Sequence, residues 1–164
     1  MESPIIVKIK KLDPVTVAFL SVIGHYSQIP DALGKLYGWI SRKGYEPQGP
    51  AITVYYNIPG EVPDDQLHWE VRSALSGGVE ESAPDRDGLG VKQTGSVQVA
   101  TTMHKGPYDA VEETYEALLS WVAANSYEIT GPPEELYFNE PAQTPPGELL
   151  TEIRVPVRKK QEEG

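Results

Sequence analysis

The segment YEPQGPAITVYYN at residues 45–57 returns in altered form as YEITGPPEELYFN at residues 127–139. The second copy begins 82 residues after the first, in a chain of 164 residues. With that offset, residues 15–72 align with residues 97–154 without a gap, and 18 of the 58 aligned pairs are identical, about 31%. The sequence is therefore a duplicated module. Two copies are too few for an open array, so we expect a closed pair with pseudo-two-fold symmetry.

Each copy is predicted to fold as strand, helix, strand and strand. Residues 5–12 and 15–22 are rich in β-branched and apolar residues, which is typical of strands. Apolar residues then recur at helical spacing in both copies: Ile29, Leu33, Leu36 and Ile40, and later Val111, Tyr115, Leu118 and Val122. Gly44 is expected to end the first helix. The predicted fold class is α+β, an antiparallel sheet with two helices on one face.

Two glycine-proline pairs follow the predicted helices. Gly49-Pro50 and Gly131-Pro132 are expected to turn the chain into the strands ITVYYN and ELYFN. Proline-rich loops then return the chain into LHWEVRSAL and LLTEIRVPV, which gives a hairpin in each copy.

We predict a single domain spanning residues 1–164. It is made of two repeats at about 5–75 and 91–158, and the Gly-, Ser- and acid-rich segment 76–90 links them.

Composition narrows the classes of function. The net charge is −10 with a pI near 4.7, and the few basic residues are scattered, so we expect no direct nucleic acid binding. The chain has no Cys, no apolar run long enough for a membrane span and no secretory signal pattern, and these features favour the cytoplasm without membrane attachment. His25, His68 and His104 lack ligand spacing, so we expect no metal and no cofactor.

Strand alternation sorts the side chains of the two hairpins. The apolar side chains on ITVYYN and ELYFN are expected to face the helices: Ile52, Val54, Tyr56, Leu136 and Phe138. The opposite face would then carry one Tyr and one Glu from each copy, Tyr55 with Glu70 and Tyr137 with Glu152. If the copies pair about a two-fold axis, these four residues could converge in one cleft. Alternatively, they simply meet water, and Arg72 and Arg154 form surface ion pairs with the two acids.

Other aromatic residues have two open interpretations. Trp39 and Trp121 lie within amphipathic helices, where aromatic residues usually belong to the core. Tyr26 and Tyr108 lie at the turn between strand and helix and could be wedges or cleft walls. Alternation sends Trp69 to the helix side unless a β-bulge redirects it.

The doubled module resembles the GyrI-like, or AraC-type effector-binding, superfamily. The similar segments are HWEV at 68–71, HKGPYDAVEETY at 104–115, EITGPPEELYFNEP at 128–141 and ELLTEIRVPV at 148–157. The resemblance covers essentially the whole chain and is more specific in the second half. It implies a cleft between the repeats that binds lipophilic, often cationic compounds. By resemblance, Glu152 and Glu70 are the candidate acids, and the candidate contacts are Tyr55, Tyr137, Trp39, Trp121, Trp69, Tyr26 and Tyr108.

The expected function is that of a stand-alone, multidrug-binding type of effector protein related to transcription regulators. No helix-turn-helix pattern is present, and the first repeat starts near residue 5, so a regulatory role would need a separate DNA-binding or regulatory partner. The alternative is an enzyme, since some members of the superfamily that carry a Trp-Glu pair resemble hydrolases of cyclopropane-bearing genotoxins. Glu152 or Glu70 would then activate water, and Trp69-Glu70 fits that pattern.

Overall fold

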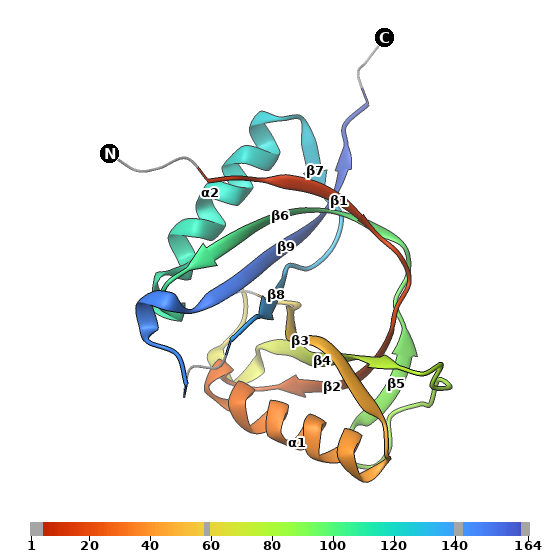
Figure 1. Cartoon of the computed structure of the whole chain (residues 1–164). Coiled ribbons are helices and arrows are strands. Elements are labelled where there is room, and N and C mark those ends of the chain that lie inside the picture. Colours follow the sequence, from red (N-terminus) through yellow and green to blue (C-terminus); the bar gives the residue numbers. More distant parts are fainter. Residues whose placement is uncertain (1–4, 58–59, 140–142, 162–164) are drawn as a thin grey trace. The chain divides into compact units, whose positions relative to one another are not determined.

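The computed structural model of the chain describes residues 5–57, 60–139 and 143–161. Within these ranges the chain forms nine β-strands and two α-helices (Figure 1). It divides into two compact units, unit 1 with residues 1–12 and 96–164, and unit 2 with residues 13–95. Each unit consists of antiparallel strands and one helix, so the predicted α+β class is confirmed. Of the helices described, none is long and apolar enough to span a membrane.

Unit 2 is a four-stranded antiparallel sheet in the order β5-β2-β4-β3. Its strands are β2 (Thr16–Ile23), β3 (Glu46–Tyr55), β4 (His68–Ser76) and β5 (Leu89–Gln93). A 3-10 turn at Tyr26–Gln28 leads into α1 (Ile29–Arg42), which packs on one face of this sheet. A second 3-10 turn, Asp64–Gln66, precedes β4.

Unit 1 has the strand order β1-β6-β9-β8, and β7 also pairs with β9. Its strands are β1 (Lys8–Leu12), β6 (Val97–Lys105), β7 (Tyr127–Ile129), β8 (Glu134–Tyr137) and β9 (Leu150–Lys159). The 3-10 turn Tyr108–Ala110 leads into α2 (Val111–Ala124), and another 3-10 turn, Pro146–Glu148, precedes β9.

Both helices arise where the apolar spacing predicts them. In α1, Leu36 and Ile40 are buried against the sheet of unit 2, and in α2, Leu118 and Val122 are buried against that of unit 1. The first helix ends before Gly44, as expected. Gly44 has φ +75°, a left-handed conformation that glycine adopts without steric cost, and its N–H donates to the Ser41 carbonyl.

The strand pairing repeats with the sequence offset of 82. Val17 lies opposite Ala74 in unit 2, and the equivalent Val99 lies opposite Pro156 in unit 1. The offset holds for the outer strands as well, since Gly90 is opposite Phe19 and Lys8 is opposite Thr101. Each unit thus takes its outer strand from the other sequence repeat: β1 pairs with β6, and β5 pairs with β2. The relation of the units by a two-fold axis stays a prediction.

Gly49-Pro50 do not lead into a new strand, so that expectation is wrong in the first copy, whereas Gly131-Pro132 do precede the separate strand β8. Gly49 and Pro50 lie inside β3, whose register against β4 shifts between Gln48 and Ile52. Gly49 has φ +77°, and such a glycine is typical of a β-bulge. In unit 1 the equivalent segment lies between β7 and β8, which both pair with β9. In both copies the segments before and after the glycine-proline pair therefore run along the same partner strand, and the pair interrupts the strand pairing only locally.

The prediction of which side chains of β3 and β8 point toward the helices is also wrong. Tyr55 lies opposite Trp69, and Tyr137 lies opposite Thr151, so both tyrosines are on the side of their helices. Val54 and Leu136 share the other face with Glu70 and Glu152. Alternation failed because both faces bury side chains: Val54 is 2% exposed and Leu136 is 4% exposed. An apolar face therefore does not identify the helix side in this fold.

The close packing of the backbone at Ser82 against Gly90 of β5 can be tested by substitution. Ser82, within the predicted linker, exchanges two backbone hydrogen bonds with Val91. A Cβ at position 90 would lie 2.7 Å from the Ser82 carbonyl oxygen. We predict that Gly90→Ala lowers the free energy of unfolding by about 1–3 kcal/mol, as overpacking does. Urea unfolding measures this loss.

Gly95→Ala is the matched control, because a Cβ there meets no atom within 4 Å. A loss of stability in Gly95→Ala that equals the loss in Gly90→Ala would contradict the steric explanation.

Candidate functional site

Glu70, one of the two predicted acids, is 2% exposed and lies on the face of β4 away from α1. Its carboxylate accepts hydrogen bonds from Ser21 Oγ at 2.8 Å and Lys92 Nζ at 2.9 Å, and it also pairs with the Arg72 guanidinium. Burial alone would raise the pKa of Glu70, but Arg72 and Lys92 outweigh it and hold the pKa below its ordinary value. Glu70 is thus a buried, ion-paired carboxylate.

Glu152 occupies the equivalent place on β9 and is 5% exposed. Arg154 Nε donates to it at 2.7 Å and Thr101 Oγ1 at 2.8 Å, while Lys10 Nζ of β1 lies 4.0 Å away. Burial would raise the pKa of Glu152. The hydrogen bonds from Arg154 and Thr101, together with the charges of Arg154 and Lys10, lower it instead.

The predicted aromatic residues fall into separate groups within each unit. Tyr26 and Tyr55 of unit 2 contact edge to face with ring centroids 5.2 Å apart, and Tyr26 Oη donates to the Asn57 carbonyl. Trp69 is fully buried, and its Nε1 donates to the Gly24 carbonyl at 2.9 Å.

The two helical tryptophans lie elsewhere. Trp39 and Trp121 each lie ten residues after the first residue of their helix. Trp39 packs edge to face on Tyr45, and Trp121 stacks on Tyr127, with ring centroids 5.9 Å and 6.0 Å apart. Within their units, neither Tyr55 nor Tyr137 shares a sheet face with the predicted acid.

A different carboxylate, Glu135 of β8, does lie among tyrosines. It is 9% exposed and faces α2 beside Tyr137. Tyr115 Oη of α2 donates to Glu135 Oε2 at 3.1 Å, and Tyr137 Oη donates to Oε1 at 3.3 Å. The Tyr108 and Tyr137 rings contact edge to face with centroids 5.7 Å apart. We call Glu135, Tyr108, Tyr115 and Tyr137 the Glu135 cluster.

The electrostatics of the Glu135 cluster are seen at Tyr108. Burial raises the pKa of the Tyr108 hydroxyl above its ordinary value, and the negative charge of Glu135 raises it further. Both effects disfavour another anion at this place. Burial disfavours a cation as well, but the negative charge of Glu135 stabilises positive charge and so favours a cation over an anion.

The helix side of unit 1 is polar where the equivalent side of unit 2 is apolar. The offset of 82 residues compares the two cores position by position. Five positions differ in this way, given with the residue of unit 2 first: Leu20/Thr102, Val22/His104, Ala32/Thr114, Leu33/Tyr115 and Trp69/Thr151. At a sixth position the buried and uncharged Thr53 is replaced by Glu135. The His104 ring donates from Nε2 to the Pro107 carbonyl at 2.9 Å, and its Nδ1 lies 2.8 Å from Thr114 Oγ1. A core that is largely apolar in unit 2 therefore contains a polar network in unit 1.

Sequence reasoning missed Glu135 because it favoured residues shared by the repeats. Glu70 and Glu152 are identical at the offset of 82, whereas Glu135 aligns with Thr53. The available signal was the difference between ITVYYN and EELYFN, which places an acid two residues before Tyr137 on the same strand face.

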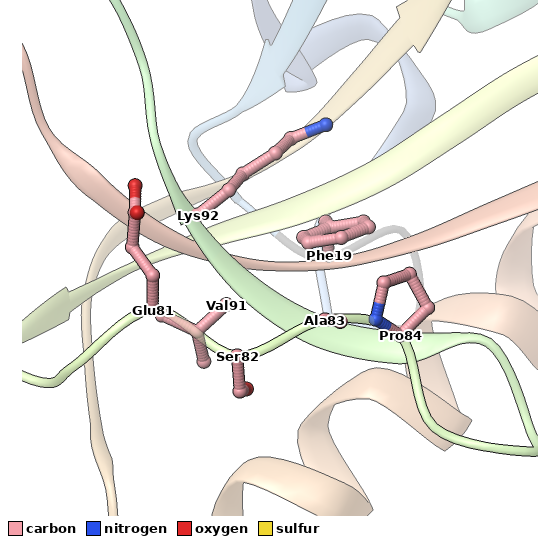
Figure 2. A pocket seen from close by; sticks show the side chains of 7 residues that line it. All are labelled: Phe19, Glu81, Ser82, Ala83, Pro84, Val91 and Lys92. Atoms are coloured by element: carbon pink, nitrogen blue, oxygen red, sulfur yellow. The ribbon is translucent and has the colours of Figure 1, made fainter.

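A hollow of about 310 Å³ lies beside β5 in unit 2. It is lined by Phe19, Glu81, Ser82, Ala83, Pro84, Val91 and Lys92 (Figure 2). Figure 2 shows the Lys92 ammonium above the Phe19 ring, 4.2 Å from its centroid, and the same ammonium pairs with Glu70. The ammonium group of this hollow is thus already paired with Glu70, and we place the candidate site at the Glu135 cluster.

The ion pair at Glu152 predicts a specific pH dependence. Because the pKa of Glu152 is lowered in the folded protein, its ion pairs stabilise the fold above the ordinary value of 4.5. That stabilisation is lost as the pH falls through the folded value. We predict that Arg154→Met raises the pKa of Glu152, as measured by NMR titration, and weakens the dependence of unfolding on acid pH.

Arg158→Met serves as the control on the same strand, since Arg158 is exposed and pairs with Glu128. An unchanged Glu152 titration in Arg154→Met would show that Arg154 does not set this pKa.

The comparisons with known proteins agree on the fold. The solved structure of EcmrR in complex with DNA matches with a TM-score of 0.80 and 21% identity over 94% of this chain, which spans only 57% of the EcmrR chain. A hydrolase from Listeria innocua matches with a TM-score of 0.73 and 14% identity, covering 95% of this chain and 94% of its own. SAV2435 bound to tetraphenylphosphonium matches with a TM-score of 0.56 and 13% identity, covering 93% of each chain.

At these identities the solved structures show the shared fold alone. Curated proteins give no match. A family model, by contrast, matches residues 6–158, which is nearly the whole chain and includes both units. The chain belongs to the GyrI-like family of small-molecule-binding domains.

Proposed function

We propose that the Glu135 cluster of unit 1 binds a lipophilic cation. The observation that carries the proposal is the buried Glu135 carboxylate held by the hydroxyl groups of Tyr115 and Tyr137. This arrangement stands where unit 2, built from the same module, has Thr53 and Leu33. Placing a carboxylate in a core is costly, so a role in binding explains why the uncharged arrangement of unit 2 does not recur in unit 1.

The chemistry of the cluster suits a weakly hydrated positive charge. A carboxylate that is shielded from water attracts a cation more strongly than an exposed one does. The rings of Tyr108, Tyr115 and Tyr137 supply cation–π contacts of about 0.5–2 kcal/mol each and an apolar surface for the ligand's hydrocarbon groups. The net charge of −10 also favours cationic ligands over anionic ones.

Two comparisons support this choice of ligand. The family is one of small-molecule binding, and SAV2435, which shares the fold, is bound to tetraphenylphosphonium in its solved structure. Tetraphenylphosphonium is a large cation covered by aromatic rings, which is the kind of molecule that a carboxylate among tyrosines recognises. It is therefore the first probe for this chain.

Binding is favoured over hydrolysis by the state of the two predicted acids. A general base works best when its pKa lies near the working pH. Glu70 and Glu152 have lowered pKa values because arginine and lysine side chains pair with them. Such carboxylates are poor bases for activating water. Turnover of a lipophilic substrate is the outcome that would replace the binding proposal with the hydrolase alternative.

The proposal predicts that charge at Glu135 decides affinity. Glu135→Gln keeps the shape of the side chain and removes its charge. We expect it to weaken tetraphenylphosphonium by about 2–5 kcal/mol, or roughly thirty- to several-thousand-fold. Neutral triphenylphosphine oxide, which keeps three of the four rings, should lose little affinity. Calorimetric titration of both compounds against both proteins measures this difference.

Two further variants sharpen the result. Glu113→Gln changes the net charge equally at an exposed position of α2 and controls for the overall field of the protein. Glu152→Gln separates the present proposal, which expects affinity to be kept, from the sequence-based prediction, which expects it to fall. Equal losses for the cation and the neutral compound in Glu135→Gln would refute a charge-based role for Glu135.

A further inference from the structure

Position 151 in unit 1 is equivalent to position 69 in unit 2, but the two residues differ greatly in size. Trp69 of β4 lies opposite Tyr55, and Thr151 of β9 lies opposite Tyr137. Both are fully buried on the helix side of their sheets. In unit 2 the indole packs in the apolar core and donates to the Gly24 carbonyl. Threonine is much smaller than tryptophan, whereas the neighbouring His104, directly opposite Thr151, is larger than Val22 of unit 2.

The Thr151 hydroxyl is also unusual in its hydrogen bonding. Among the residues that the structure describes, Thr151 Oγ1 is the buried side-chain polar atom without a hydrogen-bond partner. Its polar neighbours in the same core do have partners: Thr102 Oγ1 donates to the Ile6 carbonyl at 2.7 Å, and His104 contacts Thr114 and Pro107. A buried hydroxyl without a partner destabilises a protein, so its presence calls for an explanation.

Thr151 lies next to the Glu135 cluster. Tyr137, whose hydroxyl donates to Glu135, is its direct neighbour across β8 and β9. Glu135 itself is opposite Ile153, two residues along β9 on the same face. Diagonal neighbours of this kind are about 7–8 Å apart. Thr151 therefore lies about the length of one aromatic ring from Glu135 on the same face of the sheet.

We propose that Thr151 determines ligand specificity by hydrogen bonding, through its hydroxyl, to a polar group carried by the bound cation. This inference rests on the proposed function of the Glu135 cluster and names the ligand class more closely. The ligand is a lipophilic cation with a hydroxyl, amine or carbonyl group one ring away from its charge. The side chain at position 151 is small, whereas the indole at position 69 occupies the equivalent place in unit 2.

A matched pair of probes tests the hydrogen bond. Tetraphenylphosphonium has no hydrogen-bonding group, and (4-hydroxyphenyl)triphenylphosphonium adds one hydroxyl at the far end of a ring. We expect the wild-type protein to prefer the hydroxylated cation by about five- to tenfold, as one net hydrogen bond allows. In Thr151→Val, which keeps the shape and removes the hydroxyl, that preference should disappear while tetraphenylphosphonium still binds. A preference that survives in Thr151→Val would overturn the inference.

The unbound protein provides a second measurement. Thr151→Val removes a buried hydroxyl that has no partner, and we expect the melting temperature to rise by about 2–4 °C. Thr102→Val is the matched control, because its hydroxyl is bonded to the Ile6 carbonyl and its removal should lower the melting temperature. A lower melting temperature in Thr151→Val would show that the hydroxyl already has a partner and would overturn the inference without any ligand.

Thr151→Trp tests the effect of size. Tryptophan is accommodated at the equivalent position of unit 2, so this variant should close the site and abolish binding of both cations. If it fails to fold, Thr151→Val decides the matter. If the wild-type protein binds both cations and no Thr151 variant alters that binding, this inference is overturned and the proposed function still stands. Failure of the wild-type protein to bind either cation would overturn the proposed function together with it.

Discussion

The register of the two central strands, β4 and β9, is the constraint on which the other features of each unit depend. β4 pairs with β2 and β3, and β9 pairs with β6, β7 and β8. In an antiparallel pair, opposite residues point to the same face, so each pairing fixes which neighbours reach the helix. A shift by one residue would exchange Tyr137 for Leu136 on the helix side of unit 1 and disperse the Glu135 cluster. The site is thus a consequence of backbone pairing.

Much of the fold could be predicted because its signals are local. The helical spacing of Leu36 and Ile40, and of Leu118 and Val122, marks both helices, and the offset of 82 residues marks the duplication. The facing of β3 and β8 could not be predicted in the same way. The inference from alternating side chains assumes that one face of the sheet is exposed to solvent, but Val54 and Leu136 are buried on the face away from the helices. Tertiary burial on both faces removes the information that alternation normally carries.

Similarity between the repeats favoured acids other than the one in the Glu135 cluster. Glu70 and Glu152 are shared, and both prove to be buried carboxylates paired with an arginine two residues further along the strand. Such a pair satisfies the charge of each acid in the same way in both units. Residues common to two copies report what both copies need, which is first of all a folded sheet. Glu135 and Thr151, by contrast, replace Thr53 and Trp69 of the other repeat, so they reflect what is particular to unit 1.

Duplication explains how such a departure can be tolerated. Unit 2 keeps an apolar core in which Trp69 is buried with Leu36 and Ile40. In unit 1, Glu135 and Thr151 introduce polar groups at the same depth, and each costs stability unless a partner compensates for it. Tyrosine hydroxyls compensate for part of that cost at Glu135, whereas Thr151 Oγ1 has no partner within the described residues. Under the proposed function, a ligand that hydrogen-bonds to this hydroxyl would recover the missing hydrogen bond, and the stability lost in the core of unit 1 would add to the affinity for that ligand.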